Sequence, residues 1–138
     1  MAPLPELRVA ILKNYSMPGK GGQMMLDSLA NLSHKPRSSA QVEVYAPIEG
    51  GPLPDPNQYD LIILTGGLFN LLEKNQPAWV VDTLNLIKAV ACNDGPRKPK
   101  LLGLCWGQQA TALALGGSLA ESERGPCVIY PSLETNCK

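Results

Sequence analysis

A cysteine flanked by glycines is the part of this sequence best suited to chemistry. Residues 103–109 read Gly-Leu-Cys-Trp-Gly-Gln-Gln, between a short apolar stretch at 100–104 and a stretch of helical character at 108–115. At such a strand-to-helix turn the cysteine side chain points away from the sheet edge. It then lies at the N-terminus of the next helix, where backbone N–H groups and the helix dipole favour a thiolate. The flanking glycines suit a crowded turn because they carry no Cβ. We therefore predict that Cys105 is a nucleophile on an elbow.

Composition and charge exclude several classes of protein. The chain has 138 residues, 44% of them hydrophobic and 17% charged, which indicates one globular domain. Twelve Lys and Arg balance twelve Asp and Glu, so nothing in the charge favours nucleic acid or an anionic membrane as a partner. The sequence shows neither an apolar run of roughly 18 residues nor a secretory signal pattern at its start. We expect a cytoplasmic protein.

The cysteines and the single histidine argue against a metal centre. The four cysteines have no close spacing, and His34 is the sole histidine. Zinc sites usually need clustered thiolates or imidazoles, so we predict no metal and no cofactor. The chain is also neither short nor rich in cysteine, which disfavours a disulfide framework. Cys92, Cys127 and Cys137 are predicted to be reduced thiols with no special role.

Alternating strands and helices predict an α/β fold. Such a succession implies a mostly parallel sheet with helices on both faces. Ligands of these sheets bind at the carboxyl ends of the strands, where Thr65-Gly66-Gly67 and the Cys105 elbow are both expected. The predicted strands cover residues 7–12, 41–45, 59–65 and 100–104, and the predicted helices cover residues 23–32, 77–92 and 108–115.

These motifs resemble the class I glutamine amidotransferase family. Its nucleophile motif, G-x-C-x-G-x-Q, is matched by Gly103, Cys105, Gly107 and Gln109. Residues 60–67, an aspartate and an apolar run ending in Gly-Gly, are similar to the oxyanion strand of the family. The resemblance covers a partial domain at about residues 1–125 and implies a flavodoxin-like fold. Residues 126–138 form a short tail that does not resemble the family.

The resemblance also implies a reaction and roles for individual residues. The thiolate of Cys105 would attack the amide of glutamine or of a γ-glutamyl compound. The backbone N–H groups of Gly67 and Trp106 would stabilise the oxyanion, and Gln109 and Gly66 would help to bind the substrate. The sequence shows no second, ammonia-using domain, so we expect a free-standing γ-glutamyl-cleaving type to be the nearer relative.

One requirement of the family is missing from this sequence. The family uses a histidine and a carboxylate well downstream of the cysteine, in an H-x-E arrangement, and no histidine follows Cys105. His34 lies in a polar stretch and is interpreted as a solvated loop residue. We therefore predict a C-terminally incomplete domain without glutaminase activity. The strands at 60–64 and 101–104 should be central, and an uncovered sheet edge should favour self-association.

Two alternatives stay open. The chain could be a non-catalytic pseudoenzyme or a truncated product that binds without turnover. It could instead be a cysteine hydrolase or redox protein of the intracellular-protease branch of the same superfamily. That branch usually has histidine directly after the elbow cysteine, where this chain has Trp106. Trp79 and Trp106 could stack on a ligand, but packing in the core or at the elbow is the favoured interpretation.

Overall fold

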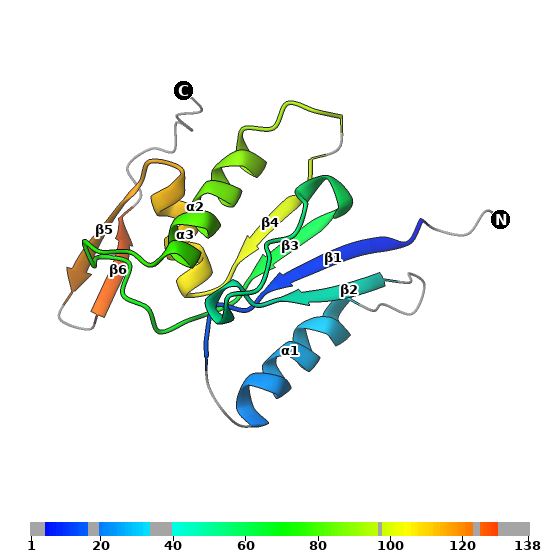
Figure 1. Cartoon of the computed structure of the whole chain (residues 1–138), viewed down its shortest axis with the longest axis horizontal. Coiled ribbons are helices and arrows are strands. Elements are labelled where there is room, and N and C mark those ends of the chain that lie inside the picture. The colour runs from blue at the N-terminus through cyan, green and yellow to red at the C-terminus, as the bar shows by residue number, and fades with distance from the viewer. Residues whose placement is uncertain (1–4, 17–19, 34–39, 97, 123–124, 130–138) are drawn as a thin grey trace.

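In the described residues four strands form one parallel sheet, with β1 (Leu7–Leu12) and β3 (Leu61–Leu64) in its interior (Figure 1). The computed structural model describes residues 5–16, 20–33, 40–96, 98–122 and 125–129. Every strand of the sheet overlaps a stretch that the sequence predicted to be a strand. In sheet order the strands are β2 (Ala40–Tyr45), β1 (Leu7–Leu12), β3 (Leu61–Leu64) and β4 (Lys100–Gly103), and each neighbouring pair is parallel.

Strand β4 lies at an edge of this sheet, which corrects the expectation that it would be central. It pairs with β3 on one side, and no strand of the described chain lies on its other side. Leu102 is accordingly 44% exposed, whereas Ile62 and Leu64 of β3 are completely buried. The apolar character of β4 has another cause, because Leu101 packs against the core beneath the helices. Only β3 meets the expectation, as a continuous aliphatic run buried on both faces.

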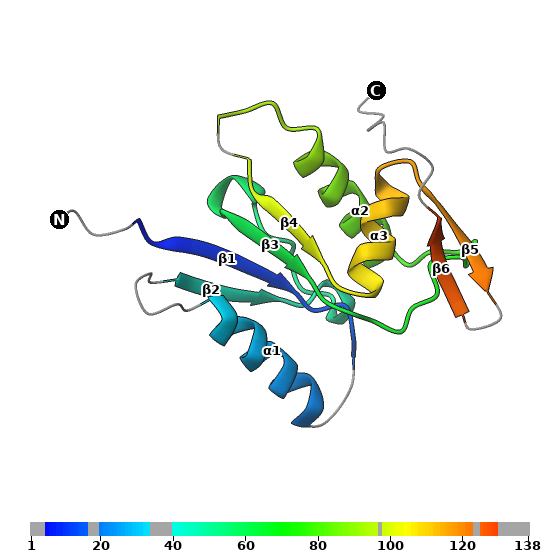
Figure 2. The same cartoon turned by 180° about the vertical axis from the view of Figure 1, so that it is seen from behind.

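Helices cover both faces of the sheet, as the sequence predicted (Figures 1 and 2). Helix α1 (Lys20–Ser33) lies on one face, and helices α2 (Ala78–Ala91) and α3 (Trp106–Ala114) lie on the other. Because strand side chains alternate between faces, Val9 and Ile11 pack in the cluster with α1, whereas their neighbours along β1 pack in the cluster with α2 and α3. No helix of the described ranges has the length and apolar character needed to cross a membrane.

The connections add two short 3₁₀ helices and a hairpin. Helices η1 (Pro47–Glu49) and η2 (Pro56–Gln58) lie in the loop between β2 and β3. Strands β5 (Ser118–Ser122) and β6 (Gly125–Ile129) pair antiparallel and form a separate two-stranded sheet. The predicted boundary at 125–126 lies within β6, so residues on both of its sides pair with β5.

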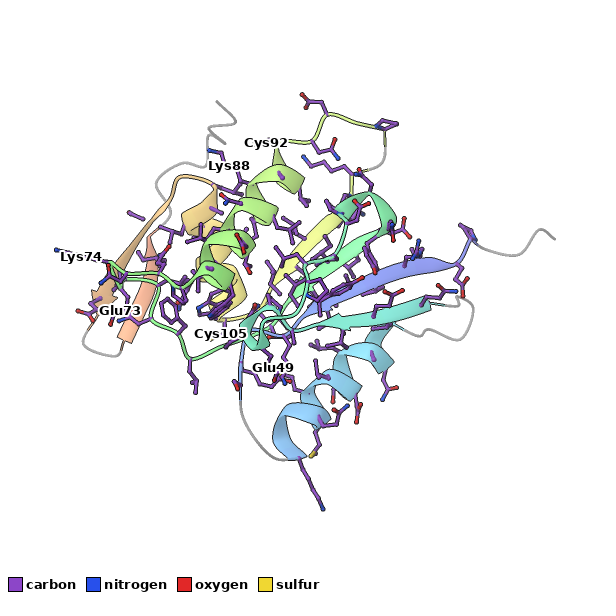
Figure 3. The ribbon with its side chains drawn as sticks, in the orientation of Figure 1. Glu49, Glu73, Lys74, Lys88, Cys92 and Cys105 are labelled. Carbon is purple, nitrogen blue, oxygen red and sulfur yellow. The ribbon has the colours of Figure 1, made fainter. Side chains whose placement is uncertain are left out.

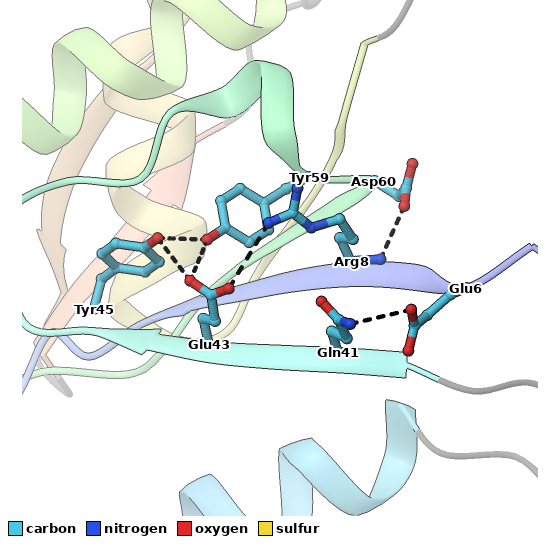
Figure 4. Close-up of polar contacts among 7 residues, drawn as sticks. All are labelled: Glu6, Arg8, Gln41, Glu43, Tyr45, Tyr59 and Asp60. Carbon is cyan, nitrogen blue, oxygen red and sulfur yellow. Dashed lines mark hydrogen bonds and ion pairs between the residues drawn. The ribbon is translucent and has the colours of Figure 1, made fainter.

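A polar cluster on one face of the sheet connects β1, β2 and the residues that precede β3 (Figure 4). Glu43 accepts hydrogen bonds from the hydroxyl groups of Tyr59 at 2.7 Å and Tyr45 at 3.1 Å, and the two hydroxyls also bond to each other. Arg8 lies 3.8 Å from the Glu43 carboxylate and 5.3 Å from the centre of the Tyr59 ring. The hydrogen bonds from Tyr59 and then Tyr45 lower the pKa of Glu43, while burial is the main cause that raises the pKa of Tyr59.

The cluster should make stability depend on pH through Glu43. Since the folded protein lowers the pKa of this carboxyl from its ordinary 4.5, its contribution is present above about pH 4.5 and is lost as the pH falls through the folded value. We expect wild type to melt at a higher temperature than Glu43→Gln at about pH 7, and the difference to shrink towards about pH 3. Thermal melts of both proteins across this range, with Glu73→Gln as an exposed control, would measure it. A difference that stays constant with pH would contradict this assignment.

Candidate active site

Cys105 has a backbone conformation that few residues other than glycine adopt. It is the N-cap residue of α3, with φ 50° and ψ −106°. Within the described chain it is the one non-glycine residue with positive φ. Such a conformation costs about 1–3 kcal/mol and persists only where the surroundings impose it. Its side chain is exposed. This is the geometry of a nucleophile elbow, in which a strained strand-to-helix turn presents the reactive side chain.

Close backbone packing imposes this conformation. A Cβ on Gly107 would overlap the carbonyl oxygen of Leu64 and lie 2.6 Å from the Leu64 Cβ. A Cβ on Gly103 would lie 2.6 Å from the carbonyl carbon of Gly107. The N–H of Leu104 donates to the Leu64 carbonyl at 2.9 Å. The first turn of α3 therefore lies directly on the end of β3, and the chain must turn sharply at Cys105 to enter it.

The two glycine-marked strand ends meet at the carboxyl edge of the sheet. Figure 3 shows Cys105 at the end towards which the strand arrows point. A Cβ built on Gly66 would lie 3.6 Å from the Cβ of Cys105, an ordinary van der Waals contact. The structure thus brings the Gly66-Gly67 turn against the elbow.

Two backbone N–H groups near the elbow have no hydrogen-bond acceptor within the described residues. In the first turn of α3, Gly107 donates to the Leu104 carbonyl at 2.9 Å, and Gln109 donates to the Cys105 carbonyl at 3.1 Å. The N–H groups of Trp106 and Gly67, by contrast, donate to no acceptor within the described part of the protein. Unpaired N–H groups are expected at a helix N-terminus, and such donors can stabilise an oxyanion.

The aromatic side chains next to the elbow pack in the interior. Trp106 is 1% exposed, and its ring centre lies 5.3 Å from that of Trp79. Trp79 in turn lies 5.9 Å from Phe69 in an edge-to-face contact. Trp106 belongs to the core cluster beneath α2 and α3, and Phe69 and Trp79 are partly buried and pack against it. These contacts favour the packing interpretation of the tryptophan pair over ligand stacking.

A cavity of about 480 Å³ lies near this aromatic group but is separate from the thiol. Residues of the η1 loop line one side of it, including Ile48 and Leu53, and Trp79 and Asp82 of α2 line the other. Cys105 is not part of the lining. Trp79, which lines the cavity, connects it to the elbow by its contact with Trp106.

Two buried polar residues lie beside the site: Thr65, which the sequence placed at this edge with Gly66-Gly67 but without a role of its own, and Asn14, which the sequence did not single out. Asn14 follows β1, Thr65 follows β3, and both side chains are 0% exposed. They hydrogen-bond to each other next to the Gly66-Gly67 turn. The sequence pattern that could have identified them is a polar residue directly after a buried apolar strand. Such positions lie at the ligand-binding edge of a parallel sheet.

The other predicted features have different outcomes. His34 lies outside the described residues. No cluster of three or more potential metal-ligating side chains occurs in the described part of the chain.

Cys92 is disulfide-bonded, so the prediction that it is a reduced thiol is wrong. Local spacing gives no sign of such a bond, because disulfide partners need only be close in space. Disulfides persist mainly in oxidising compartments, so this bond does not support the expected cytoplasmic setting.

Comparison with known proteins finds sequence relatives of this chain. No family model matches the chain. It is 54% identical over 124 residues to the glutamine amidotransferase-like protein chry6 of Gibberella zeae, an overlap that covers 90% of this chain and 51% of that protein. It is 35% identical over 81 residues to the glutamine amidotransferase-like protein chyE of Penicillium rubens, over 59% of this chain and 32% of that protein.

Solved structures show the same fold. A glutamine amidotransferase from Thermotoga maritima superposes with a TM-score of 0.61 at 24% identity, over 86% of this chain and 47% of that one. A second, from Methylobacillus flagellatus, gives 0.50 at 24% identity, over 85% and 41%. The flavodoxin-like α/β prediction is thereby confirmed. The sequence relatives show that the chain is glutamine amidotransferase-like. It spans about half the length, or less, of the relatives that it matches.

Glycine is required at position 107 for packing, and this can be measured. Gly107→Ala should lower the free energy of unfolding by about 1–3 kcal/mol, because the new Cβ overlaps the end of β3. Gly66→Ala is the matched control, since its Cβ would make only an ordinary contact. Urea unfolding of both variants would test this. Equal losses of stability would contradict the packing argument.

Proposed function

We propose that Cys105 is the nucleophile of a site that cleaves the side-chain amide of glutamine or of a γ-glutamyl compound. The observation that carries the proposal is the exposed cysteine on a strained elbow with two unpaired N–H groups beside it. Covalent acyl transfer requires a nucleophile and fixed donors at the position where negative charge develops. Similarity to glutamine amidotransferase-like proteins supports glutamine-type amides as the substrate class.

The reaction would proceed through a thioester. The Cys105 thiolate adds to the amide carbonyl carbon, and the N–H groups of Gly67 and Trp106 bind the oxyanion, each donor contributing about 3 kcal/mol. The carbon–nitrogen bond then breaks, ammonia leaves after gaining a proton, and the γ-glutamyl group remains on sulfur. Water hydrolyses this thioester and restores the thiol. Gln109, in the first turns of α3, and Gly66, in contact with Cys105, are proposed to line the substrate site.

The proton transfers need a group such as the family's downstream histidine, and no residue of this sequence matches that histidine. The nitrogen of an amide leaves as ammonia only after it is protonated. A histidine oriented by a carboxylate usually supplies the proton. His34 is the sole histidine, and none follows Cys105. Because nucleophile and base act as a unit, losing one of them removes most of the rate. We therefore propose that this chain by itself holds the nucleophile and the oxyanion donors without the proton carrier.

A site with a nucleophile and oxyanion donors but no proton carrier should not hydrolyse amides. The purified chain should release no more ammonia from glutamine or γ-glutamyl peptides than its Cys105→Ala variant, because no histidine follows Cys105 to protonate the leaving amine. A coupled ammonia assay would measure this. Robust turnover that depends on Cys105 would show that a base is present, and His34 would be the first residue to mutate.

An activated ester should reveal the nucleophile directly. With p-nitrophenyl acetate the leaving group departs as an anion and needs no proton, so acylation requires only the thiol and the oxyanion donors. We expect about one equivalent of p-nitrophenolate, and a mass increase of one acetyl group on the peptide that contains Cys105. Cys105→Ala is the control. Acetylation spread over several residues, or equal in the control, would argue against the proposed nucleophile.

The two alternatives predict different outcomes. A non-catalytic protein would not be acetylated at Cys105. A hydrolase or redox protein of the intracellular-protease branch would use a histidine directly after the cysteine. Here that position holds Trp106, whose buried ring packs on Trp79 and is suited to packing rather than to proton transfer. The observed geometry thus favours the amidotransferase-type reaction over this branch.

A further inference from the structure

A chain of hydrogen bonds reaches the proposed oxyanion turn from inside the protein. The backbone N–H of Asn14 donates to Thr65 Oγ1 at 2.9 Å, and the Thr65 hydroxyl donates in turn to the Gly66 carbonyl at 3.0 Å. Asn14 and Thr65 are both 0% exposed, so water does not compete for these bonds. The hydroxyl is therefore used as acceptor and donor at once, and its direction is fixed.

The last bond of this chain acts on the peptide unit that carries the proposed donor. The Gly66 carbonyl and the Gly67 N–H belong to the same peptide group, which is planar, so that the C=O and N–H bonds point in opposite directions and their dipoles add. A hydrogen bond that fixes the carbonyl therefore also fixes the direction of the N–H. Hydrogen bonding at the carbonyl polarises the group and strengthens the N–H as a donor.

Asn14 holds the same turn by two further contacts. Its Nδ2 donates to the Thr65 carbonyl at 3.2 Å. A Cβ on Gly67 would overlap the Asn14 carbonyl oxygen, so the backbones at the ends of β1 and β3 are in direct contact there. Asn14 Oδ1 is buried and has no partner in the described protein. The side chain of Asn14 therefore acts through its N–H₂ group, which clamps Thr65 in place.

We propose that the Thr65 hydroxyl, held by Asn14, positions and polarises the Gly66–Gly67 peptide so that the Gly67 N–H points at the oxyanion. Thr65 is a positioning residue, because it acts through the turn and does not touch the substrate. The inference rests on the proposed function and deepens it, since it states how one donor of that site is prepared.

The test compares Thr65→Val with Thr65→Ser. Valine keeps the shape of threonine but removes the hydroxyl, whereas serine keeps the hydroxyl. Each protein is acetylated with p-nitrophenyl acetate, which passes through an oxyanion, and alkylated with iodoacetamide, which reacts by displacement and forms none. The ratio of the two rates at Cys105 isolates the oxyanion donors from the reactivity of the thiol.

We expect Thr65→Val to lower this ratio about tenfold or more, and Thr65→Ser to stay within about twofold of wild type. A merely structural role would change both rates together and leave the ratio unaltered. A wild-type ratio in Thr65→Val, with urea unfolding showing an intact fold, would overturn the proposal. If Thr65→Val does not fold, Thr65→Ala removes the same hydroxyl and is judged by the same ratio.

A second measurement keeps this inference separate from the proposed function. If wild type is not acetylated at Cys105, the proposed nucleophile is refuted, and the hydrogen-bond chain is then tested by NMR. The amide ¹⁵N shift of Gly67 responds to hydrogen bonding at the Gly66 carbonyl. It should change in the variant that lacks the hydroxyl and be retained in Thr65→Ser. An unchanged shift in the variant without the hydroxyl would overturn the proposed positioning.

Discussion

The contact between the first turn of α3 and the end of β3 determines the rest of the site. Gly107 lies against Leu64 with no space for a Cβ, and Leu104 donates to the same Leu64 carbonyl. Because two backbone segments meet without side chains between them, the chain has to reverse direction within a residue or two. Cys105 accepts that reversal in a strained conformation. This strained conformation of Cys105 persists because the buried core on both sides of the sheet holds the two backbone segments in place.

Strand β3 is the common support of both halves of the candidate site. On one side β3 supports the elbow. On the other side it pairs with β1, where the backbone N–H of Thr65 donates to the Leu12 carbonyl at 3.1 Å. Asn14 then joins the end of β1 to the turn that follows β3. The position of the Gly67 N–H relative to the thiol is therefore set by strand pairing in the core. Sites supported in this way hold their donors more rigidly than sites on exposed loops.

The proposed site is a chemically coherent part of what amide cleavage needs. A nucleophile and oxyanion donors suffice for acyl transfer from an activated ester, whereas an amide also needs a proton for its leaving group. The structure accordingly presents the acyl-accepting part of the proposed site, built on the ends of β3 and β4.

The sequence by itself determined the features that depend on local patterns. Apolar runs and helical spacing predicted the strands and helices of the sheet, and the glycine spacing around Cys105 predicted the elbow, because each involves residues close along the chain. Tertiary structure alone decided the edge position of β4, the β5–β6 hairpin and the disulfide at Cys92. It also created the hydrogen bond between Asn14 and Thr65, which are 51 positions apart. Pairings of this kind depend on which surfaces the whole chain can bury together, and local residue preferences do not encode them.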